Sequence, residues 1–149
     1  MSDNWLQYIP TDPGFIPTAI AAANAEKFLA TLAPLADEVK FEFSDSIRFY
    51  HPGANWSGVE CPACGADAEP WWSNAMDRAA ENGFRSLKVV APCCGADLSL
   101  NELRYVWPAG FGSFVIQAMN PNLKSLTAEQ LNQLACILGC SLREIAAHL

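Results

Sequence analysis

Two short turns of nearly identical sequence, each carrying two cysteines, constrain this chain more than any other feature. The first turn, residues 61–67, reads Cys-Pro-Ala-Cys-Gly-Ala-Asp, and the second, residues 91–97, reads Ala-Pro-Cys-Cys-Gly-Ala-Asp. Two thiolates three residues apart can bind one tetrahedral ion from a tight turn, and a following glycine can adopt the positive φ angle that turns backbone amides toward the sulfurs. We therefore expect the two turns to supply the ligands of one metal site.

The second turn is an imperfect copy of the first. Ala91 stands in the place of Cys61, and Cys93 stands in the place of Ala63. The spacing of the four cysteines is C-x2-C-x28-C-C, and it predicts one structural Zn2+ held by thiolates. The predicted metal ligands are Cys61, Cys64, Cys93 and Cys94.

The identity of the fourth ligand stays open, because two adjacent cysteines reach one ion less easily than a C-x2-C pair. If Cys93 points away, His51 or a carboxylate such as Asp97 completes the site instead. The other two cysteines, Cys136 and Cys140, lie in an apolar segment and in the turn after it. We expect them to be small core residues and not ligands.

The two turns resemble the cysteine knuckles of the zinc-ribbon and treble-clef class of metal-binding folds. The residues that carry the resemblance are Cys61-Pro62-Ala63-Cys64-Gly65 and Pro92-Cys93-Cys94-Gly95, in the middle third of the chain. The resemblance implies a zinc ion with a structural role.

Composition excludes several classes of protein. Of the 149 residues, 51% are hydrophobic and 17% are charged, a balance that excludes a disordered chain. A net charge of −7 argues against broad binding to nucleic acid or to an anionic membrane. No segment has the pattern of a membrane span or of a signal peptide. We therefore predict one domain over residues 1–149 in the cytoplasm, where thiols stay reduced.

Hydrophobic periodicity predicts an α+β fold with a mainly antiparallel sheet and flanking helices. Residues 1–17 are rich in proline and are expected to form an irregular lead. The alternation over 39–50 predicts either a hairpin or one long bent strand. Capping-box patterns at Thr127 and Ser141 predict a pair of short helices that closes the chain. The other expected elements are helices at 18–33 and 69–82 and strands at 87–91, 98–100 and 114–119.

The negative charge is concentrated in the first half of the chain. Residues 1–69 carry ten acids and three bases, whereas residues 70–149 carry six of each. An acidic surface with exposed aromatic side chains can attract and hold a basic protein. The leading prediction is therefore a non-enzymatic, zinc-stabilised protein of bacterial type that binds another protein, for example as an immunity or antitoxin-type inhibitor. The predicted partner-binding residues are Glu42, Asp45, Trp56 and Glu60.

A first alternative is a transcriptional regulator. Residues 134–145 resemble the helix-turn-helix of bacterial DNA-binding domains, with Ala135 at the helix crossing and Gly139 in the turn. The resemblance implies that residues 127–149 bind DNA. The chemistry argues against it, because Arg143 stands beside a glutamate and is the only arginine or lysine in the expected recognition helix.

A second alternative is a zinc-dependent hydrolase or deaminase. A catalytic zinc needs an open coordination position and usually has histidine or carboxylate ligands. His51 and His148 are the only histidines in the chain, so the sequence favours a structural site.

Overall fold

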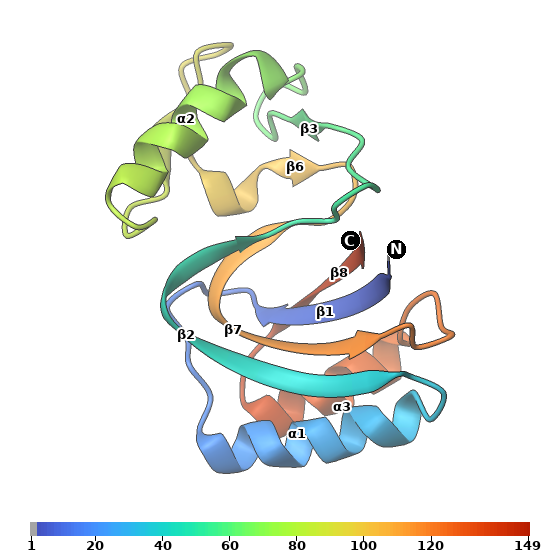
Figure 1. The fold of residues 1–149 in the computed structure, drawn as a ribbon. Coiled ribbons are helices and arrows are strands. Elements are labelled where there is room, and N and C mark those ends of the chain that lie inside the picture. Colours follow the sequence, from blue (N-terminus) through green and yellow to red (C-terminus); the bar gives the residue numbers. More distant parts are fainter. Residues whose placement is uncertain (1–2) are drawn as a thin grey trace.

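The protein consists of a lower lobe built on a four-stranded sheet and an upper lobe that holds two small strand pairs (Figure 1). The structure is a computed structural model, and it describes residues 3–149. The predicted α+β class with a mainly antiparallel sheet is confirmed. In chain order the elements are β1 (Asn4–Pro10), α1 (Ala19–Leu32), β2 (Glu38–Tyr50), β3 (Val59–Glu60), α2 (Glu69–Glu81), β4 (Lys88–Val90), β5 (Asp97–Ser99), a 3-10 helix (Leu100–Glu102), β6 (Arg104–Tyr105), β7 (Gly110–Met119), α3 (Ala128–Leu138) and β8 (Leu142–His148).

The four long strands lie in the order β2-β7-β1-β8, and each neighbouring pair is antiparallel. Apart from the segment inserted between β2 and β7, the chain runs β-α-β-β-α-β, which is the split β-α-β or ferredoxin-like motif. The two ends of the chain meet, since Asp3 N donates to Leu149 O at 2.6 Å.

Helices α1 and α3 cover one face of the sheet (Figure 1). Thr18 caps α1 by accepting a hydrogen bond from Ala21 N at 3.1 Å, and Thr127 forms the predicted capping box with Gln130 at the start of α3. Within residues 3–149, no helix has both the length and the apolar composition needed to cross a membrane. The core between sheet and helices contains Leu6, Tyr8, Ala25, Leu29, Phe114, Ile116, Leu134 and Leu138.

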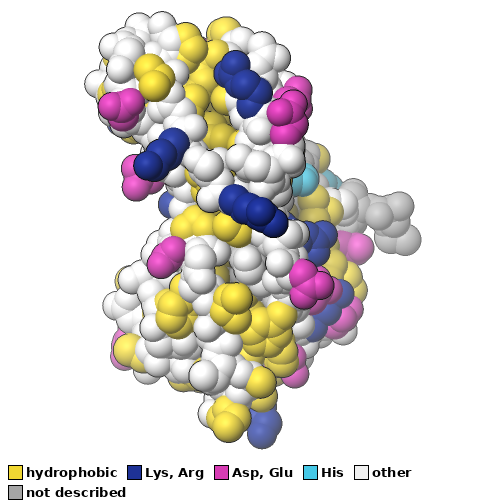
Figure 2. Space-filling view, turned by 90° about the vertical axis from the view of Figure 1, so that its left-hand side faces the viewer, with side chains coloured by type: hydrophobic (Ala, Val, Ile, Leu, Met, Phe, Trp, Pro, Cys, Tyr) yellow, Lys and Arg dark blue, Asp and Glu magenta, His cyan; other side chains and the backbone are white. Residues whose placement is uncertain are grey.

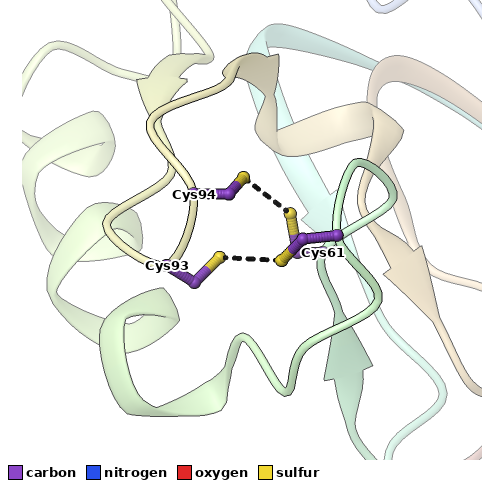
Figure 3. Close-up of side chains that lie close together, drawn as sticks. Cys61, Cys93 and Cys94 are labelled. Atoms are coloured by element: carbon purple, nitrogen blue, oxygen red, sulfur yellow. Dashed lines mark hydrogen bonds between the residues drawn. The ribbon is translucent and has the colours of Figure 1, made fainter.

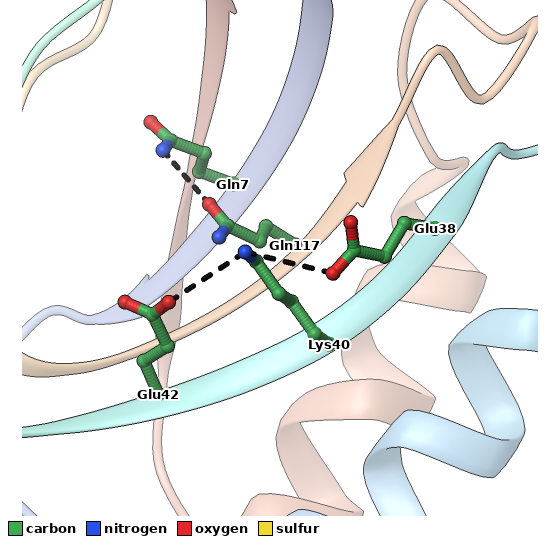
Figure 4. A network of polar contacts seen from close by, with 5 residues as sticks. All are labelled: Gln7, Glu38, Lys40, Glu42 and Gln117. Carbon is green, nitrogen blue, oxygen red and sulfur yellow. Dashed lines mark hydrogen bonds and ion pairs between the residues drawn. The ribbon is translucent and has the colours of Figure 1, made fainter.

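The opposite face of the sheet carries polar side chains. Gln7 Nε2 of β1 donates to Gln117 Oε1 of β7 at 3.0 Å, and both side chains are buried. On β2, the Lys40 ammonium lies 3.5 Å from a carboxylate oxygen of Glu38 and 3.7 Å from one of Glu42 (Figure 4). These charges lie on an edge strand, where charged side chains disfavour pairing with another chain.

Residues 38–50 form one long bent strand, which decides between the two predicted arrangements. Pairing of β2 with β7 runs from Glu38 to Phe43, is interrupted by an irregularity, and resumes at Arg48. Interruptions of this kind, β-bulges among them, bend a strand and increase its twist. The bend carries the chain from the sheet into the upper lobe.

The prediction of an irregular lead over residues 1–17 is wrong for its first part. Residues Asn4–Pro10 form β1, which lies between β7 and β8 in the middle of the sheet. The strand is buried on both faces from Leu6 onward, so it lacks the alternation expected of a half-buried strand. Met1 and Ser2 lie outside the described residues.

The predicted C-terminal helix pair is wrong in its second member. Residues Leu142–His148 form β8, which pairs with β1 over all seven residues of both strands. The local pattern after Ser141 favours a helix, but strand pairing satisfies the backbone of β1 and buries Ile145 and Ala147. Tertiary contacts therefore override the local helix signal at this end of the chain.

The upper lobe is the segment inserted between β2 and β7, and it meets the lower lobe at a narrower waist (Figure 2). Its strands are only two or three residues long. Strand pairs this short contribute little stability on their own. An aromatic core supports them, formed by Phe49, Trp56, Trp72, Tyr105 and Phe111.

Candidate metal centre

The first cysteine turn follows β3 and is closed by two backbone hydrogen bonds. Cys61 N donates to Ala66 O at 2.8 Å, and Gly65 N donates to Cys61 O at 2.8 Å. Gly65 has a φ angle of 76°, a conformation that glycine adopts without steric cost. The turn has the tight, positive-φ geometry expected from its sequence.

The second turn joins β4 to β5 and repeats this backbone. Ala91 N donates to Ala96 O at 2.9 Å, and Gly95 N donates to Ala91 O at 2.7 Å. Gly95 has a φ angle of 74°. The two turns are therefore structural copies of each other, as the repeated sequence predicted.

Four sulfurs converge between these turns (Figure 3). The Sγ atoms of Cys61 and Cys94 are 3.8 Å apart, those of Cys64 and Cys93 are 3.5 Å apart, and all four lie within 4.8 Å of one another. A tetrahedral ion with metal–sulfur bonds of about 2.3 Å would separate its sulfurs by about 3.8 Å. The cluster therefore has the dimensions of a four-thiolate shell and can hold one metal ion.

The four thiols differ in exposure and in acidity. Cys61 is buried, whereas Cys64, Cys93 and Cys94 are exposed at the surface. The backbone N–H of Cys64 lowers the pKa of Cys61 to about 7, because it stabilises the thiolate. The pKa of Cys93 is raised to about 12, mainly because its thiolate would lose solvation. Hydrogen bonds with the thiols of Cys64 and Cys61 add to this rise. Full ionisation of the cluster therefore needs a cation at its centre.

Neither alternative to Cys93 belongs to the cluster. The His51 ring stacks on Phe49 with centroids 5.9 Å apart, and its Nδ1 accepts a hydrogen bond from Gly53 N at 3.1 Å. Asp97 is the first residue of β5 and is likewise outside the group of close ligand atoms. Cys93 is thus the residue placed to complete the four.

The last two cysteines lie apart from the cluster. Cys136 is exposed on α3, and Cys140 is half-buried against the core of the lower lobe. The expectation of a core position therefore fits Cys140 and is wrong for Cys136, whose side chain reaches solvent because it lies on the outer side of α3.

The acids predicted to bind a partner are spread over both lobes. Glu42 lies on β2 beside Lys40, and Glu60 lies on β3 with a carboxylate oxygen 3.7 Å from Arg104 Nη1. Asp45 lies at the bend of β2, where it lines a hollow of about 480 Å³ between the lobes together with Arg85.

Trp56, the fourth predicted partner-binding residue, is half-buried in the aromatic core of the upper lobe. Its ring lies 4.9 Å from that of Trp72, and its Nε1 donates to Glu69 Oε1 at 3.2 Å. Only part of the ring is therefore available to a partner.

Sequence reasoning gave no structural role to Arg143. On β8 this half-buried side chain uses Nη1 to donate to Asn101 O and Asn101 Oδ1, both at 3.0 Å, and to Ala109 O at 2.8 Å. Burial lowers the pKa of Arg143. A Cβ on residue 110 would lie 2.5 Å from this Nη1, so the side chain of Arg143 approaches the backbone closely there. The glycine at position 110 is the one sequence feature that indicates this contact.

Comparison with protein-family models, with curated proteins and with solved structures gives no match for this chain. The functional argument therefore depends on the chemistry of the described residues.

Proposed function

We propose that this chain is a non-enzymatic, zinc-stabilised protein that acts by binding another protein. The observation that carries the zinc part of the proposal is the set of four thiols whose sulfurs lie within 4.8 Å of one another. Soft thiolate ligands in a tetrahedral arrangement favour Zn2+ over Mg2+ or Ca2+. Four thiolates fill the coordination shell and leave no position for water or substrate, which supports a structural role for the ion.

Zinc at this site would fasten the upper lobe together. One ligand pair follows β3, and the other lies between β4 and β5, so the ion links segments about 30 residues apart. Because the strands of this lobe are so short, we expect metal binding to supply much of its folding free energy. The ion would thereby fix the aromatic core and the surface around it.

The proposed partner is a basic protein that contacts the acidic first half of the chain. Glu42 and Glu60 each face a cation, but exposed ion pairs contribute only about 0–1 kcal/mol and can be exchanged for pairs with a partner. In residues 3–149, no lysine, arginine or histidine nitrogen comes within 4.0 Å of the Asp45 carboxylate. Asp45 is therefore the most available of the predicted contacts, and an immunity or antitoxin-type inhibitor is the concrete version of the proposal.

Neither alternative is carried forward. The transcriptional regulator required a recognition helix at residues 142–149, where β8 lies instead. The zinc enzyme required an open coordination position, which a four-thiolate set does not leave.

The proposal is tested by cross-linking the tagged protein in its source cells, identifying the captured protein, and titrating the two purified proteins. We expect a 1:1 complex that Asp45→Lys weakens about ten-fold, because charge reversal places like charges together. The matched control is Asp77→Lys, which makes the same change at an exposed position of α2. Equal affinities of the two variants, or no complex between the purified proteins, would contradict the proposed surface.

A further inference from the structure

The sheet ends on one side at β8, whose outer edge is only partly covered. The ladder between β1 and β8 includes the mutual bonds of Asp3 with Leu149 and the bond from Thr11 N to Ser141 O. Because bonding alternates along an antiparallel strand, the backbone groups at the even positions 142–148 point away from β1.

The chain itself begins a ladder on this edge. His148 N donates to Pro52 O at 3.0 Å, and Ala54 N donates to His148 O at 2.9 Å. The next outward carbonyl, that of Ala146, accepts from Asn55 Nδ2 at 3.3 Å. Beyond this point, no hydrogen bond within residues 3–149 uses the outward backbone groups of Glu144. The edge is therefore open at the backbone groups of Glu144 and at the N–H of Ala146, next to the ladder that the chain has already started.

Space for an extended segment lies beside this edge. A cavity of about 360 Å³ is lined by Arg143 and Glu144 of β8 and, from the upper lobe, by Tyr105 and Pro108. A second cavity, of about 850 Å³, includes Ala146 of the same strand together with Asn55 and Trp107 of the upper lobe.

The first cavity is basic, although the protein as a whole is acidic. Arg104 and Arg143 both line it, and the pair of Arg104 with Glu60, at 3.7 Å, is exposed to solvent and can be exchanged. In the described part of the chain, no carboxylate lies within 4.0 Å of the Arg143 guanidinium. Three oxygen atoms hold Nη1 of Arg143, which orients the guanidinium and leaves the Nε and Nη2 donors for another group.

The acid on the same strand does not neutralise this charge. Glu144 Oε2 accepts from Tyr8 OH at 2.8 Å and from Leu126 N at 3.0 Å. Tyr8 belongs to the core between the sheet and the helices, so the Glu144 carboxylate is directed to that side. The free Nε and Nη2 donors of Arg143 are therefore suited to bind a carboxylate of another molecule.

The two edges of the sheet are therefore unlike. The edge strand β2 has an irregularity between Phe43 and Arg48 and alternating charges at Glu38, Lys40 and Glu42, features that disfavour pairing with another strand. On β8 both charged side chains are tied to groups within the protein. The β8 edge is thus the one suited to accept a strand.

We propose that the β8 edge binds an extended acidic segment of a partner protein by β-augmentation. The segment pairs with the outward backbone groups of Glu144 and with the N–H of Ala146. One of its carboxylates meets the guanidinium of Arg143 and competes with Glu60 for that of Arg104. The inference rests on the proposed protein-binding function and adds to it a second contact of opposite charge.

The probe for this site is an acetylated, fluorescein-labelled six-residue peptide with alternating valine and glutamate. Binding is followed by fluorescence polarisation and by amide chemical shifts of the zinc-loaded protein. We expect the largest shifts at Glu144 and Ala146. A lysine-for-glutamate peptide is expected to bind about ten-fold more weakly. Two further peptides carry N-methyl groups, one on its glutamate amides and the other on its valine amides. At least one of them is expected to lose binding, since methylation removes the backbone N–H groups that would pair with β8.

A variant pair tests the charge. Arg104→Glu is expected to weaken binding about five-fold, whereas Arg78→Glu, the same change at an exposed position of α2, leaves it unchanged. Both variants must keep the zinc content and melting temperature of the parent.

Several results would overturn the inference: no binding up to about 1 mM peptide, equal binding of all peptides, or shifts confined to β2. A dimer in solution with its Glu144 and Ala146 amides protected from exchange would overturn it too, because a second copy would then occupy the edge. If the protein holds zinc and the peptide fails, the proposed function still stands. A zinc-free folded protein would instead contradict that function.

Discussion

Ala91 occupies in the second cysteine turn the position that Cys61 occupies in the first. Gly65 N donates to Cys61 O at 2.8 Å and Gly95 N donates to Ala91 O at 2.7 Å, and both Cys61 and Ala91 are fully buried. The first turn therefore offers sulfurs from its first and fourth positions, whereas the second offers them from its third and fourth. This displacement explains how adjacent cysteines reach a site built by two equivalent turns.

The equivalence makes a rescue experiment possible. Cys93→Ala removes one ligand and is expected to weaken zinc binding by at least ten-fold. Adding Ala91→Cys to that variant restores the C-x2-C spacing of the first turn and is expected to recover most of the affinity. Competition with a chromophoric chelator measures both values. A double variant that binds no better than the single one would show that the two turns are not equivalent around the metal.

A serine substitution separates the two classes of cysteine. Cys64→Ser is expected to release the metal and to destabilise the fold by about 3 kcal/mol or more, since metal binding is coupled to folding. Cys136→Ser makes the same change at an exposed position of α3 and is expected to stay within about 0.5 kcal/mol of the parent. Urea unfolding combined with metal analysis measures both effects, and similar losses in the two variants would contradict a metal role for Cys64.

Two glycines of β7 provide a matched test of the Arg143 contact. A Cβ at position 110 would lie 2.5 Å from Arg143 Nη1 and 3.0 Å from Ile9 Cδ1, whereas a Cβ at position 112 would have no neighbour closer than 3.6 Å. Gly110→Ala is therefore expected to lower the free energy of unfolding by about 1–3 kcal/mol, because the contact must be displaced. Gly112→Ala is expected to be neutral or mildly stabilising, and urea unfolding of the two variants checks the difference.

Alkaline pH is expected to destabilise the upper lobe through Tyr105. Burial raises the pKa of this phenol from 10.0 to about 12, and its OH donates to Leu100 O at 2.7 Å. Since the folded pKa is the higher one, the stabilisation is complete below about pH 10 and is lost as the pH rises through about 12.

Unfolding by urea at pH 8.5 and pH 11 measures this loss. Tyr105→Phe is expected to be less stable than the parent at pH 8.5 by about 1 kcal/mol, the value of one hydrogen bond, and to lose less stability at pH 11. Burial also raises the pKa of Tyr8, so some pH dependence should remain in the variant. Equal losses in parent and variant would exclude Tyr105 as a source of the effect.

The sequence predicted that the four cysteines of the two turns come together, because the information for these turns is local. Spacing, the glycine after each pair and the repeated tetrapeptide are all properties of seven-residue segments, and the two turns fold as those segments indicate. Which ligand came fourth depended on how the two turns meet. The structure brings the Cys93 sulfur, and neither His51 nor Asp97, close to the other three.

The two ends of the chain were predicted poorly because they stabilise each other. Residues 4–10 and 142–148 become strands by pairing over seven residues, and neither segment has the alternating pattern of an independent strand. A proline-rich lead and a capping-box pattern at Ser141 were the strongest local signals, and both were overridden by that pairing. The open edge of β8 and the structural contacts of Arg143 were missed for the same reason.

The most direct test of the zinc-stabilised fold is native mass spectrometry with elemental analysis on protein purified without added metal. We predict one zinc per chain, held by the four thiolates of Cys61, Cys64, Cys93 and Cys94, and loss of the upper lobe's cooperative unfolding when a chelator removes it. A folded protein that contains no zinc and in which all four thiols react freely would contradict the account.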